Sequence, residues 1–306
     1  MNSDVMIKSD YSFPVYRRGK VRDLYDLLDS LLIVSTDRIS AFDVVFPNGI
    51  PKKGSALNNL SSYWFEKTQP IFPNHFIEKK DDRSIRVVKA DRIDIEFVAR
   101  SYLYGSAWRN YSKGKHVISG INLPNGLRLA EKLPEIILTP TTKSDVGHDL
   151  EISKNEAIER NLVSRDEWIA LEEATLRLYE FYTSEASQKG LIIPDFKLEF
   201  GRVRDELIQI DEPPTHDSAR LWSKEKYEIG KKQEGYSLDK EFLRDFLIRR
   251  GYMGDGPPPN LPTLLVEQIS TRCVGAFEVL TGQNKLNDLQ LMSVDQVINE
   301  LKREEK

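Results

Sequence analysis

The sequence is poor in cysteine: Cys273 is the only one in 306 residues. An internal disulfide framework and a cysteine-rich zinc module are therefore excluded. The sequence also lacks a run of about 20 apolar residues, the length that a membrane-spanning helix needs. Residues Met1 to Asp10 mix polar and charged side chains and contain no apolar stretch typical of a signal peptide. We therefore expect a cytoplasmic protein without a membrane partner.

No charge of one sign dominates, since 44 Lys and Arg stand against 48 Asp and Glu, a formal net charge of −4. A balance this close to neutral gives no reason to expect a nucleic-acid partner, and no basic stripe with interleaved aromatic residues is present. The chain also lacks a Walker A pattern and a nucleotide-binding Gly-x-Gly-x-x-Gly, which weakens P-loop and Rossmann interpretations. Any anion site must come from local clustering of cations.

The elements that the sequence does contain predict an α+β fold. Hydrophobic residues make up 40% and charged residues 30% of the chain, which is typical of a globular protein. Short β-rich runs dominate from Phe13 to about Ala99, interrupted by one helical pattern over 54–67. Helical signals then strengthen, with capping boxes at Ser153/Glu156 and Ser164/Glu167. Helices are expected over 165–189, 239–249, 263–280 and 294–302.

The most informative segment is DFKLEFG at Asp195–Gly201. On a strand, Asp195, Lys197 and Glu199 share one face, while the aromatic and aliphatic side chains share the other. Three charges beside so many apolar neighbours indicate a wet cleft, a cation or an ionic ligand. The alternative is an ordinary solvated outer face with a lysine between two acids.

A turn near Asp205 favours the cation or ionic ligand over the solvated face, because it places Glu199 opposite Asp211 on the returning strand. Opposed carboxylates destabilise a strand pair unless a divalent cation lies between them. Magnesium suits such a pair, since it takes few protein carboxylates and leaves positions open for phosphate oxygens. We therefore predict that Glu199 and Asp211 bind Mg²⁺.

Two cations lie beside a glycine near the start of the chain. Gly19 lets the backbone turn, and Lys20 and Arg22, two residues apart, are expected to project together from a strand. This arrangement suits the binding of a polyphosphate. The alternative is that both cations are ordinary solvated side chains in front of a strand. The glycines of the segment 251–259 resemble a phosphate-binding loop, but prolines follow and no helix opens there, so a structural turn is favoured.

Several blocks, in order along the chain, resemble the SAICAR synthetase (phosphoribosylaminoimidazole-succinocarboxamide synthase) family. They are GKVRDLY at Gly19–Tyr25, STDRISAFD at Ser35–Asp43, IEFVARSYLYGS at Ile95–Ser106, TPTTK at Thr139–Lys143, DFKLEFG at Asp195–Gly201, DEPPTHDSARLW at Asp211–Trp222 and DKEFLRDFL at Asp239–Leu247. The resemblance covers nearly the whole chain. Two departures are His216, where the family suggests proline, and a short segment at 144–147.

The resemblance implies a two-lobed α+β fold, with a small β-rich N-terminal lobe at 1–99 and a larger ATP-grasp-like lobe at 100–306. It also implies an ATP- and Mg²⁺-dependent ligase of purine biosynthesis that joins L-aspartate to 5-amino-1-(5-phospho-ribosyl)imidazole-4-carboxylate. The expected small-molecule partners are this ribotide, L-aspartate and ATP. The site residues that it implies fall into four groups: Lys20, Arg22, Glu199 and Asp211 for ATP; Glu199 and Asp211 for magnesium; Arg100, Ser106, Lys143 and Arg220 for the ribotide or another anionic substrate group; and Lys197, Asp195 and Asp149 for catalysis.

A carboxylate is a poor acylating agent, so the expected route passes through an acyl phosphate. Asp195 and Asp149 are both candidates for the base that accepts the proton of the aspartate amine. Two other functions compete with this one. A phosphotransferase shares the nucleotide site, but the kinase His-Arg-Asp and Asp-Phe-Gly motifs are missing. A nucleotide-sensing protein that had lost catalysis is disfavoured because both metal carboxylates and the basic pair are present.

Overall fold

The computed structural model describes residues 5–143 and 150–304. Its helices are Lys53–Thr68 (α1), Gly105–Tyr111 (α2), Lys154–Glu159 (α3), Arg165–Gln188 (α4), Glu241–Arg249 (α5), Thr263–Leu280 (α6) and Val294–Glu304 (α7), with 3-10 turns at Glu234–Tyr236 (η1) and Leu286–Asp288 (η2). Its strands are Val15–Arg18 (β1), Arg22–Asp26 (β2), Ser30–Ser35 (β3), Arg38–Ala41 (β4), Val44–Gly49 (β5), Phe76–Lys79 (β6), Ser84–Val88 (β7), Asp91–Tyr102 (β8), Val117–Ile118 (β9), Ile121–Asn122 (β10), Lys132–Leu138 (β11), Thr141–Thr142 (β12), Leu191–Ile192 (β13), Asp195–Val203 (β14), Glu206–Ile210 (β15) and Trp222–Ser223 (β16).

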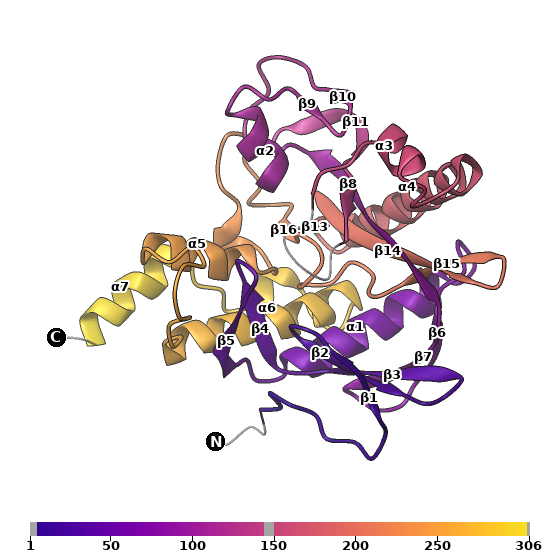
Figure 1. The fold of residues 1–306 in the computed structure, drawn as a ribbon. Coiled ribbons are helices and arrows are strands. Elements are labelled where there is room, and N and C mark those ends of the chain that lie inside the picture. Colours follow the sequence, from indigo (N-terminus) through magenta and orange to yellow (C-terminus); the bar gives the residue numbers. More distant parts are fainter. Residues whose placement is uncertain (1–4, 144–149, 305–306) are drawn as a thin grey trace.

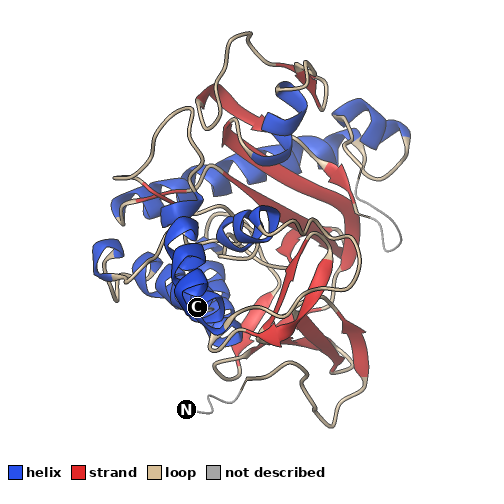
Figure 2. Ribbon diagram, turned by 90° about the vertical axis from the view of Figure 1, so that its left-hand side faces the viewer, coloured by secondary structure: helices blue, strands red, loops and turns tan. Residues whose placement is uncertain are grey.

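Two antiparallel sheets organise the chain (Figure 1). The N-terminal sheet has the strand order β1-β2-β3-β7-β6, and the central sheet has the order β11-β8-β14-β15, with β12 pairing to β8. Figure 2 shows the strands running down one side of the molecule, with most of the helices on the other side. This mixture of antiparallel sheets and separate helices agrees with the predicted α+β class.

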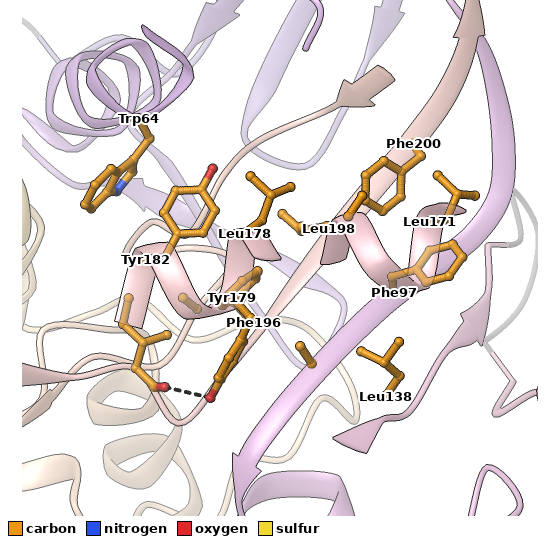
Figure 3. Close-up of a cluster of buried hydrophobic side chains, with 14 of the residues drawn as sticks. Trp64, Phe97, Leu138, Leu171, Leu178, Tyr179, Tyr182, Phe196, Leu198 and Phe200 are labelled. Carbon is orange, nitrogen blue, oxygen red and sulfur yellow. Dashed lines mark hydrogen bonds between the residues drawn. The ribbon is translucent and has the colours of Figure 1, made fainter. Parts of the chain in front are cut away.

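Helix α4 covers one face of the central sheet. The side chains that it buries against β8 and β14 form the main core, and ten of them are labelled in Figure 3: Trp64, Phe97, Leu138, Leu171, Leu178, Tyr179, Tyr182, Phe196, Leu198 and Phe200. Tyr179 keeps its hydroxyl satisfied by donating to the Ile193 carbonyl oxygen at 3.0 Å. Because alternate residues of β14 fill this core, the residues between them must face away from α4.

Helix α1 joins the two sheets. Phe65 packs against Ile33, Ile85 and Val87 of the N-terminal sheet, whereas Trp64 belongs to the main core. The helix also contacts α6, which lies beside it in Figure 1. Helix α1 therefore connects the N-terminal sheet, which contains β2, to the main core beneath β14.

The predicted helix starts are confirmed. Ser153 and Ser164 each accept a hydrogen bond from the N3 backbone amide, and Glu156 and Glu167 return it to the N-cap amide. Gly190 follows α4 with a φ of 77°, the left-handed conformation expected of a C′ glycine. Within 5–143 and 150–304, no helix is both long and apolar enough to cross a membrane.

The division into lobes at residues 1–99 and 100–306 stays a prediction. Strand β8 runs through residue 99, and the β4–β5 hairpin packs its Ile39, Ala41 and Phe46 against helices α5, α6 and α7. The segment 251–259 contains no helix or strand, which agrees with the predicted turn. The two proposed lobes are thus closely interleaved around the site.

Candidate active site

The polar face of β14 is flanked by a strand on each side. On β8, Arg100 pairs in register with Asp195, and Glu96 pairs with Glu199. On the other side, β15 returns after a turn between Val203 and Glu206, where the sequence placed it. Strand β14 is therefore an interior strand of the sheet, and side chains from β8 and β15 lie beside its charged side chains.

The exposed fractions separate the two interpretations of this face. Asp195 and Glu199 are 4% and 3% exposed, so the solvated-face alternative is wrong for both acids. The Lys197 side chain is 25% exposed and reaches the surface of the same face. Burying carboxylates is costly unless cations and hydrogen-bond donors surround them. Cations and hydrogen-bond donors do surround the two carboxylates of this strand.

Two lysines and three acids form a central charged cluster. Lys197 Nζ lies 2.9 Å from Glu96 Oε1 and 3.5 Å from Asp211 Oδ2, and it also donates to Glu199. Lys143 Nζ lies 3.1 Å from Glu96 Oε1 and also donates to Glu199. Lys143 is therefore an ion-paired member of this cluster rather than a solvated loop lysine.

The strand register differs by one residue from the predicted one. Glu199 lies opposite Ile210 rather than Asp211, which follows the end of β15 with a φ of 66°. This left-handed turn takes the backbone out of the strand, and the Asp211 carboxylate still reaches Lys197. The two acids thus meet at one cluster, although they are not a directly opposed strand pair.

The two acids have opposite electrostatic environments. Burial raises the pKa of Glu199, and the charge of Asp211 raises it further, while the lysines act in the other direction. Burial also acts to raise the pKa of Asp211, but Arg22 and Lys197 overcome it and hold that pKa well below its usual range. The surroundings of Asp211 therefore favour its charged form, whereas those of Glu199 oppose it, and an added cation would favour a charge on Glu199.

Arg22 brings the N-terminal sheet to this cluster. Its Nη2 forms an ion pair with Asp211 and lies 3.8 Å from Glu212 Oε1, and its Nη1 donates to the Asp211 carbonyl oxygen at 3.2 Å. Lys20 behaves differently, because it lies in the turn before β2 and pairs with Asp43, with 53% of its side chain exposed. The prediction that the two cations project together from one strand is therefore wrong.

A second charged cluster lies at the other end of the polar face. Asp195 accepts hydrogen bonds from Arg100 Nη1 at 3.2 Å and from Arg220 Nη1 at 2.7 Å. Arg100 also donates to the Ser106 hydroxyl at 3.1 Å, and Arg220 donates to Glu241 at 3.1 Å. The structure thus brings together three of the four predicted substrate-binding residues, Arg100, Ser106 and Arg220, while the fourth, Lys143, belongs to the central cluster.

The carboxylates fit magnesium only as part of a nucleotide site. Among residues 5–143 and 150–304, no group of three or more His, Cys, Asp or Glu is arranged to hold a metal ion. Mg²⁺ in nucleotide sites usually takes one or two carboxylates and completes its shell with phosphate oxygens and water. Glu199 and Asp211 offer that set, and the pKa of Glu199 is raised by its acidic neighbour, which an added cation would offset.

With this geometry, the chain can be compared with known proteins. Residues 15–258 match the family model described as SAICAR synthetase. The chain belongs to the SAICAR synthetase family. It is therefore a ligase of purine biosynthesis, as the sequence motifs indicated.

Relatives within this family match nearly the whole chain. A phosphoribosylaminoimidazole-succinocarboxamide synthase of Thermodesulfovibrio yellowstonii is 42% identical over 281 residues, which cover 87% of this chain and 94% of the relative. The Geobacter sulfurreducens enzyme of the same name is 40% identical, with coverage of 92% and 100%. A SAICAR synthase from Saccharomyces cerevisiae, solved in complex with SAICAR, matches with a TM-score of 0.81 and 35% identity over 92% of this chain and 99% of that one. These matches confirm the predicted fold class.

The motifs missed some residues that belong to the charged clusters. Glu96 stands inside the IEFVARSYLYGS block but was given no role, although it binds both lysines of the central cluster. Its polar position in the alternating run Ile95-Glu96-Phe97 was the available signal. Asp149 and the short segment 144–147 lie outside the described residues. His216 is buried at 1% exposure, which lowers its pKa to about 3.

Proposed function

We propose that this chain uses ATP to activate the carboxylate of 5-amino-1-(5-phospho-ribosyl)imidazole-4-carboxylate and then joins it to the amine of L-aspartate. The observation that supports it most directly is the meeting of Arg22, Lys197 and Lys143 with Glu199 and Asp211 at one end of a buried polar strand. A relative described as a SAICAR synthetase in complex with ADP is 25% identical with a TM-score of 0.65, and it supports the assignment of ATP as substrate.

The central cluster suits the transfer of a phosphoryl group. The ribotide carboxylate must approach an anionic triphosphate, and the protein's task is to cancel that repulsion. Arg22 and Lys197 supply fixed cations there. We assign Lys20 to the outer phosphates, because its side chain is more than half exposed in the turn that precedes Arg22. Magnesium held by Glu199 and Asp211 would neutralise phosphate charge.

The reaction then proceeds in two balanced steps. A carboxylate oxygen attacks the γ-phosphorus, and the bond to the β-phosphate oxygen breaks to give an acyl phosphate and ADP. The aspartate amine next attacks the acyl carbon and expels phosphate, losing one proton. Lys197 and Lys143 lie where they can hold the transferred phosphoryl group, because both contact Glu199.

Asp195 suits positioning better than proton transfer. Arg220 Nη1 contacts both of its carboxylate oxygens, at 2.7 and 2.8 Å, and Arg100 contacts one of them. Both oxygens of Asp195 are thus engaged by guanidinium groups, which suits a carboxylate that orients those groups. We therefore assign the base to Asp149 and the orientation of the two arginines to Asp195. We also propose a cytoplasmic location, since the only cysteine, Cys273, is buried and unpaired.

The experiment is a turnover assay with ¹⁸O in the ribotide carboxylate. The proposal predicts that phosphate release requires both ribotide and aspartate and that one ¹⁸O appears in the released phosphate. Phosphate release without aspartate would instead favour a phosphotransferase or an ATPase. Release of unlabelled phosphate alone would exclude the acyl phosphate, because the carboxylate oxygen would then have stayed on carbon.

A further inference from the structure

One segment of the chain connects the two charged clusters of the polar face. It starts at Asp211, whose carboxylate reaches Lys197, and it ends at Arg220, which binds the Asp195 carboxylate. We call residues 211–220 the site loop. The site loop contains no helix or strand, so its course depends on contacts with other elements.

The backbone of the site loop is hydrogen-bonded to β14. The amide of Lys197 donates to the Ser218 carbonyl oxygen at 3.4 Å, and the amide of Arg220 donates to the Asp195 carbonyl oxygen at 3.2 Å. Strand β15 pairs with β14 only from Glu199 onward, so the loop takes over where β15 has ended. A shift of the loop would therefore disturb the backbone beside Lys197 as well as the position of Arg220.

Asp217 anchors the site loop to two helices. Its side chain is 4% exposed, and its carboxylate lies between two lysines. Oδ1 is 3.2 Å from Nζ of Lys53 in the first turn of α1, and Oδ2 is 3.5 Å from Nζ of Lys240, the residue before α5. Because Ser218 follows Asp217 directly, the anchor acts one residue away from the hydrogen bond to Lys197.

The two lysines depend on this one carboxylate. Among residues 5–143 and 150–304, Asp217 is the only acid within ion-pair distance of Lys53 or Lys240. Lys53 is 0% exposed, and its Nζ has no hydrogen-bond acceptor in the same part of the chain. A buried ammonium group is costly unless a carboxylate compensates it. The positions of α1, α5 and the site loop are therefore coupled through Asp217.

We propose that Asp217 is a positioning residue of the ligase: by holding the site loop against α1 and α5, it sets the placement of Lys197 and Arg220. The inference rests on the proposed function and adds to it a residue that acts through others. With 4% of its side chain exposed and both oxygens beside lysines, Asp217 has little surface to offer a substrate. An ion pair with a purely structural role would stabilise the fold without setting these two side chains.

The test variant is Asp217→Asn, which keeps the shape of the side chain and removes its charge. We expect kcat to fall about 10- to 100-fold and KM for the ribotide to rise about 10-fold, because Lys197 and Arg220 both shift with the loop. KM for ATP should change less than threefold, since Arg22 holds Asp211 at the start of the loop independently. Steady-state kinetics with each substrate varied in turn give these constants.

The neighbouring residue provides the matched control. His216 is 1% exposed in the same loop, and neither of its ring nitrogens has a hydrogen-bond partner among the described residues. His216→Leu therefore changes the packing of the loop and leaves the ion pairs of Asp217 in place. We expect its kcat and its KM for the ribotide to stay within twofold of wild type. Losses equal to those of Asp217→Asn would show that any change in the loop has this effect, and they would overturn the inference.

A double variant separates positioning from stability. Asp217→Asn leaves Lys53 buried without its acid, so its melting temperature should fall. Lys53→Met combined with Asp217→Asn removes that buried charge and should recover most of the melting temperature. The kinetic losses should remain, because the carboxylate that anchors the loop is still missing. Recovery of kcat and of the ribotide KM together with the melting temperature would assign Asp217 a structural role only.

Calorimetric titration of the ribotide, without ATP or turnover, distinguishes this inference from the proposed function. Ribotide binding about 10-fold weaker in Asp217→Asn than in His216→Leu supports the positioning of Arg220 even if the wild-type protein fails as a ligase. Ligase turnover by the wild type, with kcat and ribotide binding within twofold of it in Asp217→Asn, would overturn the inference and leave the proposed function intact.

Discussion

Arg22 and Asp211 are 189 positions apart in the sequence and form an ion pair that ties the N-terminal sheet to the central hairpin. The contact has two parts, since Arg22 reaches both the side chain and the carbonyl oxygen of Asp211. The left-handed turn at Asp211 makes this possible by directing the carbonyl toward β2. This ion pair thus brings the cation that we propose for phosphate and the acid that we propose for the metal into one site.

This relationship separates the roles of the two N-terminal cations. Arg22→Met would remove the cation that the half-buried Asp211 and the buried Glu212 share, so we expect both a higher KM for ATP and a lower melting temperature. Lys20→Met removes only an exposed pair with Asp43, so KM for ATP should rise with no measurable change in melting temperature. Kinetics with varied ATP and thermal unfolding of both variants provide the measurement. Equal losses of stability in the two variants would contradict the distinction.

The metal assignment predicts a large loss of turnover on neutralising either acid. Glu199→Gln and Asp211→Asn should each lower kcat by about 100-fold or more while the protein stays folded. Asp211→Asn should also raise the Mg²⁺ concentration for half-maximal rate, because one anionic ligand is lost. Glu225→Gln is the control, since that side chain is 58% exposed and pairs with Lys226. Wild-type turnover in both variants would remove Glu199 and Asp211 from the mechanism.

Much of the site was predictable because it follows from strand alternation. The run Asp195-Phe196-Lys197-Leu198-Glu199 fixes which side chains enter the core, and the structure confirms that division. The turn before Glu206 was predictable for a similar reason, since only a short polar segment separates two β-rich runs. Local patterns of this kind depend on nearest neighbours and are therefore visible in one sequence.

Other parts of the site depend on contacts that no local pattern records. The one-residue difference in register arises from the positive φ of Asp211, a conformation that aspartate adopts only in particular contexts. The separate direction of Lys20 depends on its ion pair with Asp43, which lies between β4 and β5. Arg244 shares the acceptor Glu241 with Arg220 only because α5 packs near the end of β14 that carries Asp195. Tertiary structure decides these positions.

The close approach of Arg220 to Gly105 gives a test with a matched control. Gly105 has a φ of 59°, and a Cβ there would lie 2.4 Å from Arg220 Nη2. Gly114 has a φ of 87° with no atom within 4 Å of its added Cβ. Gly105→Ala and Gly114→Ala should both lose about 1 kcal/mol of stability through backbone strain. Only Gly105→Ala should also raise KM for the ribotide, because it displaces Arg220. Equal KM values in the two variants would show that Arg220 shifts without cost.

The last prediction concerns stability against pH at the start of α4. Glu167 closes the capping box and also binds Arg202 Nε at 2.6 Å, and this hydrogen bond, although partial burial opposes it, lowers the pKa of Glu167 to about 2. A carboxylate with a lowered folded-state pKa stabilises the fold above its unfolded pKa of 4.5, and this contribution is lost as the pH falls from 4.5 toward 2. Glu167→Gln keeps the cap and removes the ion pair. We therefore expect it to lower the free energy of unfolding by about 1 kcal/mol at pH 7, a value reduced because the ion pair is partly exposed, and by much less near pH 3.

Glu156→Gln is the matched control, because Glu156 closes the capping box of α3 in the same way and forms no ion pair with an arginine among the described residues. Denaturant unfolding of the three proteins at both pH values measures the difference, and a loss in Glu167→Gln that is as large near pH 3 as at pH 7 would assign it to packing rather than to charge.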